Sequence, residues 1–135
     1  MSALQWIMIY MAAIAAFFLI DLVWLGVVAQ GFYKAQLGPL LAERTNWPVA
    51  LLFYLLYIAG LLYFVVQPGL DAGSWTSVAV RGAIFGIITY ATFDLTCLAL
   101  FRDFPYVVAA VDMLWGAVLA GSVSVVAWRV ATALG

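Results

Sequence analysis

Three aspartates, Asp21, Asp94 and Asp112, each lie inside a stretch that otherwise reads as an apolar membrane-spanning helix. An ionised carboxylate at the centre of a bilayer costs about 2.5 to 3.5 kcal/mol on insertion scales. We therefore expect the three side chains to face the bundle interior, a polar cavity or one another. Burial and mutual repulsion both favour the neutral acid, so one or more of the three is expected to be protonated. Acids placed in this way predict a functional site.

Three tyrosines are expected to lie around these acids. Tyr54 falls at a matching depth in another apolar stretch, and Tyr57 lies one turn deeper. Tyr90 lies one turn deeper than Asp94 on the same stripe, because residues four apart share one face of a helix. Tyrosine hydroxyls can hydrogen-bond a buried carboxyl group, and aromatic rings can hold a cation.

One short pattern occurs twice with the same spacing. Asp21-x-x-Trp24 and Asp112-x-x-Trp115 each place an aspartate and a tryptophan on one side of a helix. The indole N–H of one helix can therefore reach a carboxylate on a neighbouring helix. Because both tryptophans lie away from the predicted membrane interfaces, an interfacial aromatic belt does not explain them.

The composition requires lipid as the solvent for much of the surface. The chain has 135 residues, of which 69% are hydrophobic and 8% charged, and its mean hydropathy is +1.19. A soluble domain of this length could not bury so much apolar surface. The net charge of −1 gives no indication of a nucleic-acid partner.

The lack of histidine and the single cysteine, Cys97, exclude several chemistries within this chain. Histidine-ligated haem or zinc and cysteine-ligated iron–sulfur clusters have no ligand set. Cys–His and Ser–His hydrolases have no base. We expect neither a metal nor a cofactor, and we expect Cys97 to be a small packing residue.

Four apolar stretches are each long enough to cross a bilayer, which takes about 20 helical residues. They are predicted over residues 4–29, 48–67, 77–101 and 105–128. Gln67-Pro68-Gly69 is predicted to end the second stretch, and the short polar break Arg102-Asp103 predicts a tight hairpin. The sequence therefore predicts an all-α polytopic membrane protein, with residues 1–135 forming one antiparallel bundle of four transmembrane helices.

The connection between the first two stretches, residues 30–47, has two interpretations. It could form a short interfacial helix on the bilayer surface, or it could extend the first helix and pack on the bundle. Three side chains on the membrane face nearest the acids are candidate access or headgroup contacts: Tyr33, Lys34 and Arg102.

Small residues predict sites of close helix packing. Gly82 and Gly86 form a GxxxG step in the third stretch, and Gly116 and Ala120 repeat the spacing in the fourth. These steps can build the bundle itself, or they can support a homodimer or a larger membrane complex.

Several motifs spread over nearly the whole length resemble one protein family. They are Asp21-Leu-Val-Trp24-Leu-Gly26, Phe32-Tyr33-Lys34, Asn46-Trp47, Phe53-Tyr54-Leu-Leu-Tyr57-Ile-Ala-Gly60, Gly86-Ile-Ile-Thr-Tyr90-Ala-Thr-Phe93-Asp94-Leu-Thr96 and Val111-Asp112-Met-Leu-Trp115-Gly116. On these residues the chain is similar to the bacterial domain-of-unknown-function family 2177 of predicted membrane proteins.

The resemblance implies a multi-pass protein of the bacterial inner membrane, and it implies no particular activity or substrate. The family pattern reads Tyr-Asp-Leu-Thr-Asn in the third helix. This chain has Phe93 and Cys97 in place of the tyrosine and the asparagine, so two polar groups of the family pattern are missing.

Three classes of function are open at this point. The first is a pocket of acids and aromatics, opening to one membrane face, that binds and could transport a small cationic, protonatable or amphipathic ligand. The second is a membrane enzyme or accessory factor acting on lipid, with the acids as general acid and base. The third is a structural or assembly subunit in which the acids fix helix packing. The candidate ligand-binding residues are Asp21, Trp24, Tyr54, Tyr57, Tyr90, Asp94, Asp112 and Trp115.

Overall fold

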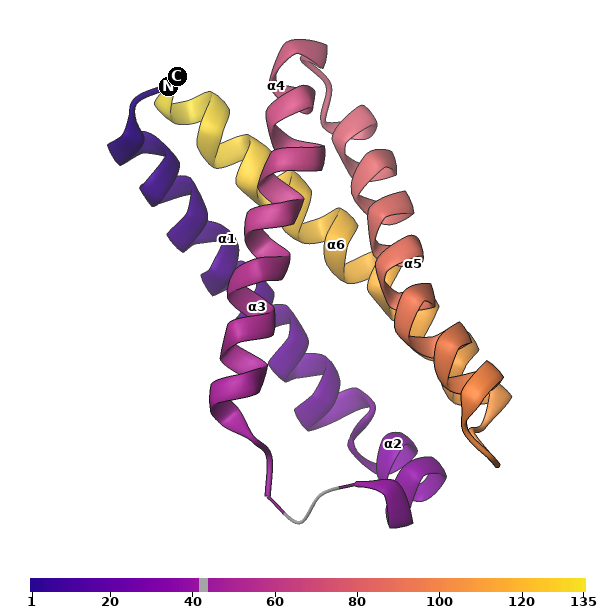
Figure 1. Cartoon of the computed structure of the whole chain (residues 1–135). Helices are drawn as coiled ribbons and strands as arrows, with labels where there is room; N and C mark the ends of the chain where they lie inside the picture. Colours follow the sequence, from indigo (N-terminus) through magenta and orange to yellow (C-terminus); the bar gives the residue numbers. More distant parts are fainter. Residues whose placement is uncertain (42–43) are drawn as a thin grey trace.

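Four long helices dominate the computed structural model, which describes residues 1–41 and 44–135 (Figure 1). They cover Ala3–Val28, Trp47–Asp71, Trp75–Leu100 and Tyr106–Leu134, and each is long and apolar enough to cross a membrane. No strand occurs in the described part of the chain. The predictions of an all-α fold and of four membrane-spanning helices are confirmed.

Each span comprises one or more of the helices labelled in Figure 1. The first consists of α1 (Ala3–Val23) and a π-helical turn (Trp24–Val28). The second consists of α3 (Trp47–Leu61), a π-helical turn (Leu62–Val66) and α4 (Gln67–Ala72). The third and fourth are α5 (Trp75–Leu100) and α6 (Tyr106–Leu134). The short α2 (Gln30–Leu37) and a 3-10 turn (Gly38–Leu40) follow the first span.

The second span runs further than the sequence suggested. It does not end at Gln67 but continues through Pro68 to Ala72. Proline lacks the N–H of a regular helical turn, and Pro68 sits in the first turn of α4, directly after the π-helical turn. In such a first turn a missing N–H is tolerated. The helix ends only where Gly73 takes a left-handed backbone conformation, with φ of 66°.

The hairpin of α5 and α6 is the most closely packed pair in the bundle. The α1 helix packs against α6 as well. The short turn between α5 and α6 contains Asp103, whose φ of 62° lies in the left-handed region that aspartate tolerates. Figure 1 shows both chain termini at one end of the bundle and α2 at the other, with α3 and α5 diverging toward the α2 end.

The small residues singled out in the sequence lie in the contact between α5 and α6. Gly82, Gly86, Gly116 and Ala120 are all buried there. A Cβ added at Gly86 would collide with the backbone of Gly116, so the two helices meet backbone to backbone. These steps therefore build the bundle, and their burial within one chain leaves them unable to face a second copy.

The α2 helix is separate from the first span and packs on the bundle. Its side chains Phe32, Tyr33 and Leu37 pack against a buried cluster at the adjoining ends of α5 and α6. That cluster consists of Cys97, Phe104, Val108 and Ala109. Cys97 is thus a packing residue, and α2 covers the end of the hairpin that lies nearest the acids.

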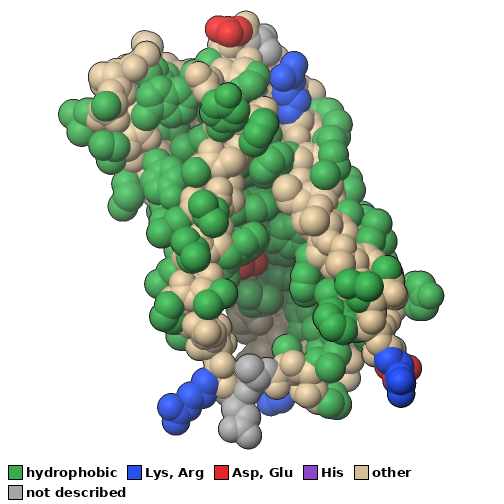
Figure 2. All heavy atoms as spheres, in the orientation of Figure 1, with side chains coloured by type: hydrophobic (Ala, Val, Ile, Leu, Met, Phe, Trp, Pro, Cys, Tyr) green, Lys and Arg blue, Asp and Glu red, His purple; other side chains and the backbone are tan. Residues whose placement is uncertain are grey.

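Apolar side chains cover the outside of the molecule. Leu19, Leu56, Ile88 and Leu114 are each at least 60% exposed. On the face drawn in Figure 2, the lysine and arginine side chains lie toward the two ends of the bundle, and hydrophobic side chains fill the surface between them. This distribution suits a bilayer around the middle of the bundle.

Candidate functional site

Asp21 is held by a tryptophan from another span. The indole Nε1 of Trp115 donates a hydrogen bond to Asp21 Oδ1 over 3.1 Å. This bond joins α1 to α6, and it is the kind of contact that the repeated Asp-x-x-Trp spacing predicted. Asp21 is only partly buried, and its Oδ1 is paired with the indole N–H of Trp115.

The second tryptophan of the pattern reaches its aspartate through a tyrosine. Trp24 stacks on Trp115, with ring centroids 4.5 Å apart and planes 9° from parallel. The Trp24 Nε1 donates to the hydroxyl of Tyr33 at 3.4 Å, and that hydroxyl donates to Asp112 Oδ1 at 3.0 Å. Trp24 also begins the π-helical turn, an irregularity that often occurs at functional sites.

Tyr33 was expected only as an access contact, but it bonds directly to an acid. It belongs to α2, outside the four spans, and its side chain is half-buried. Burial raises the pKa of Tyr33 above its usual range, and the nearby Asp112 raises it further, whereas the bond from Trp24 acts in the opposite direction. The hydroxyl therefore keeps its proton and can donate to Asp112.

Of the three site aspartates, Asp94 differs in that neither of its oxygens accepts a hydrogen bond from a described tryptophan or tyrosine. Its side chain is 0% exposed, and neither carboxyl oxygen has a hydrogen-bond partner among the described residues. Asp112 lies near enough to interact with it electrostatically. An isolated buried charge is very costly, so Asp94 needs a proton, which it can share with the neighbouring Asp112, or a cation or hydrogen-bond donor beside it.

A cavity of about 340 Å³ is lined by Asp112 of this pair, whereas Asp94 lies behind it and is not a lining residue. Its lining residues come from three helices: Phe53, Tyr57, Thr89, Tyr90, Phe93 and Asp112. Figure 2 shows a hollow in the side of the bundle between α3 and α5, with an acidic side chain at its floor. The sequence suggested a pocket opening to one membrane face. In Figure 2 the hollow lies on the side of the bundle, and α2 packs over the end of the hairpin nearest the acids.

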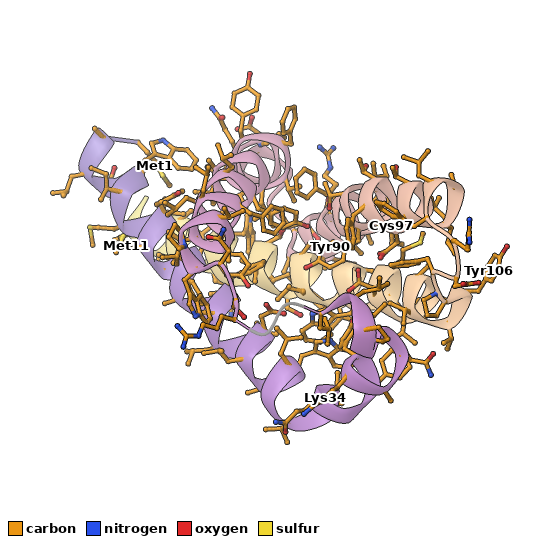
Figure 3. The ribbon with its side chains drawn as sticks, turned by 60° about the horizontal axis from the view of Figure 1, so that its bottom comes forward. Met1, Met11, Lys34, Tyr90, Cys97 and Tyr106 are labelled. Carbon is orange, nitrogen blue, oxygen red and sulfur yellow. The ribbon has the colours of Figure 1, made fainter. Side chains whose placement is uncertain are left out.

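Two tyrosines predicted for the site line this cavity. Tyr57 and Thr89 share a hydrogen bond of 3.0 Å between their hydroxyl groups. Tyr90 packs over Gly116, where any added Cβ would collide with its ring. Figure 3 shows Tyr90 extending from α5 into the interior of the bundle. A glycine at this point of α6 therefore gives Tyr90 its position.

Three lining residues, Phe93 as well as Phe53 and Thr89, were not predicted as site residues. Phe53 lies four positions before Tyr57, and Thr89 is adjacent to Tyr90 and four positions before Phe93. The same four-residue periodicity that placed Tyr90 with Asp94 could have identified these positions.

The remaining candidates lie outside the cavity. Tyr54 packs against Phe17 and Phe18 at centroid distances of 5.1 Å, and it interacts electrostatically with Asp21. Lys34 and Arg102 are exposed, and Figure 3 shows Lys34 on the outer side of α2. Their role as headgroup contacts stays a prediction.

The three acids do not form a cage for a metal ion. Within residues 1–41 and 44–135, no group of three histidine, cysteine, aspartate or glutamate side chains is arranged to hold one. Asp21 accepts from Trp115, whereas Asp112 accepts from Tyr33 and lies beside Asp94. The site thus consists of a bonded acid, Asp21, and an acid pair, Asp94 and Asp112, beside an aromatic cavity.

Comparison with known proteins identifies the family. No curated protein and no solved structure matches the chain. One family model, described as a predicted membrane protein of the domain-of-unknown-function type, matches residues 6–129. That range contains all three acids, both tryptophans of the repeated pattern and every residue that lines the cavity. The chain belongs to this family of predicted membrane proteins, DUF2177.

Proposed function

We propose that this integral membrane protein binds a small cationic, protonatable or amphipathic ligand at the Asp94–Asp112 pair. The observation that carries the proposal is Asp94, which is fully buried with both carboxyl oxygens unpaired among the described residues. Intramembrane acids without a protein partner commonly mark a ligand or ion pathway. A protonated amine is the simplest group that would satisfy this pair.

The lining of the cavity suits such a ligand. Four of its six lining residues are aromatic, and one is the carboxyl-bearing Asp112. Aromatic faces attract a cation, the more so where water is excluded. The hydroxyl groups of Tyr57 and Thr89 are already bonded to each other, so the carboxyl groups remain as the main acceptors for a ligand.

Asp21 has a different role in this proposal. Its carboxyl group accepts the hydrogen bond of Trp115 and does not line the cavity. It ties α1 to α6 and holds the tryptophan stack in place, so it positions the site without contacting the ligand. The structural interpretation of the acids thus applies to Asp21, and the ligand-binding interpretation to Asp112, which lines the cavity, together with its buried neighbour Asp94.

Binding of octylamine, a protonatable amphiphile, to the purified protein in lipid nanodiscs tests the proposal. We expect Asp94→Asn to weaken binding about tenfold or more, which corresponds to at least about 1.4 kcal/mol. Asparagine keeps the size of the side chain but removes the negative charge. Octanol, which has the same chain without the amine, should bind the parent and the variant equally.

Asp103→Asn is the matched control. Asp103 is exposed in the α5–α6 turn, and asparagine tolerates its left-handed backbone conformation equally well. This variant should bind octylamine as the parent does. Unchanged octylamine binding by a folded Asp94→Asn protein would refute the proposal. If Asp94→Asn does weaken binding, uptake of octylamine into proteoliposomes would show whether the protein also transports the bound ligand.

A further inference from the structure

We infer that the ligand reaches this pocket from within the bilayer, between α3 and α5, and is a single-chain amphiphile with a protonated amine head. This inference rests on the proposed function and adds the ligand's class and route. Three observations support it: the side opening of the cavity, the packing of α2 on the end of the hairpin, and the size and charge of the pocket.

The side opening lies between two phenylalanines that belong to both the cavity and the outer surface. Phe53 of α3 and Phe93 of α5 both line the cavity, and they are 48% and 61% exposed. They lie on helices that diverge toward the α2 end of the bundle (Figure 1). In Figure 2 the hollow between these helices opens on the side of the molecule, among hydrophobic side chains. This side faces lipid, so a molecule dissolved in the bilayer meets the opening directly.

At the end nearest the acids, α2 packs on the α5–α6 hairpin. Phe32, Tyr33 and Leu37 pack on the hairpin ends, where Val108 is only 2% exposed. Tyr33 also bonds to Asp112. A water-soluble ligand arriving between α2 and the hairpin would have to displace α2 and break that hydrogen bond. The sideways route requires neither step.

The size of the pocket determines where the parts of the ligand lie. About 340 Å³ is near the lower limit for small-molecule sites. It accommodates an ammonium head and the first part of a chain, but not a long chain. Asp112 lies in the cavity lining and the two phenylalanines lie at the outer surface, so the head would point inward and the chain would extend between Phe53 and Phe93 into the lipid.

A reversible cross-link across the opening tests the route. In a Cys97→Ala background, Phe53→Cys and Phe93→Cys would be joined by a bifunctional thiol reagent with a cleavable linker. The rate at which dodecylamine associates with the protein in nanodiscs is measured before linking, after linking and after cleavage. We expect the link to slow association about tenfold or more, and cleavage to restore it.

Two further cysteine pairs make the result specific. Ala79→Cys with Ser122→Cys lies in a groove on the other side of the α5–α6 hairpin, so this link should leave the rate unchanged. Leu37→Cys with Phe104→Cys would fasten α2 to the hairpin, and this link should also leave the rate unchanged.

The outcomes separate the route from the proposed function. Association that slows with the α2 link but not with the link at the opening would overturn the route and leave the proposed function intact. Association that neither link slows would also overturn the route. A parent protein that binds no dodecylamine at all would overturn the proposed function, and the inferred route with it.

Discussion

At the scale of single residues, the repeated Asp-x-x-Trp pattern has two different outcomes. Trp115 donates directly to Asp21, whereas Trp24 donates to Tyr33, which in turn donates to Asp112. The stacked indoles lie between the two hydrogen-bond arrangements. Each of these hydrogen bonds fixes the orientation of one carboxyl group. The orientation of Asp112 therefore depends on Tyr33, which belongs to α2 and lies outside the spans.

The bond between Trp115 and Asp21 makes the first prediction at this scale. Trp115→Phe keeps an aromatic ring against Trp24 but removes the donor, which leaves a partly buried carboxyl oxygen unpaired. We expect a loss of about 1 to 3 kcal/mol in the free energy of unfolding, measured by titration with sodium dodecyl sulfate in mixed micelles.

Trp75→Phe is the control for this change. Trp75 is 59% exposed at the start of α5, and the substitution should alter the unfolding free energy by no more than a few tenths of a kcal/mol. Combining Trp115→Phe with Asp21→Leu should cost less than the sum of the single changes, because both remove the same bond. Strict additivity of the two costs would show that the bond contributes nothing to stability.

At the scale of helices, the backbone contact between α5 and α6 positions the cavity. Gly86 and Gly116 bring the two helices together, and Tyr90 packs over Gly116 on its way to the cavity. A change in the spacing of the helices would therefore move a wall of the site as well as weaken the hairpin.

Gly86→Ala tests this coupling between packing and site. A Cβ at Gly86 would collide with the backbone carbonyl of Gly116, which cannot move aside as a flexible side chain would. We expect a loss of about 1 to 3 kcal/mol in stability from overpacking, together with weaker octylamine binding in the fraction that remains folded. Gly26→Ala has nothing within 4 Å of its added Cβ, so it should lower neither the stability nor octylamine binding.

The elements themselves followed from the sequence, because each span is a long apolar stretch and the acids interrupt those stretches visibly. The contact of Trp115 with Asp21 could also be expected, since three-residue spacing places both types on one helix side. The role of Tyr33 could not be expected from the sequence. It depends on α2 folding back onto the hairpin, which is a contact between residues far apart in the chain. The continuation of the helix past Pro68 was missed because a π-helical turn has no clear sequence signal.

At the scale of the whole molecule, the four spans place Asp94 and Asp112 closer to one side of the membrane. An even number of spans puts both termini and the α4–α5 connection on one side, and α2 and the α5–α6 turn on the other. Asp94 and Asp112 lie nearer the second side, because both are closer to the α5–α6 turn than to the opposite ends of their helices. Access from the bilayer would therefore involve mainly the leaflet on the α2 side.

Sidedness can be tested with single cysteines in a Cys97→Ala background. Lys34 and Arg102 are exposed on the α2 side, and Asp71 is exposed near the α4–α5 connection. Lys34→Cys and Arg102→Cys should react with a membrane-impermeant maleimide from the same side of sealed vesicles. Asp71→Cys should react only from the opposite side, and all three should react after permeabilisation.

Labelling of Lys34→Cys and Asp71→Cys from one side would contradict a second span that crosses the bilayer. It would also remove the lipid-facing opening between α3 and α5, because that opening requires α3 to lie within the membrane beside α5.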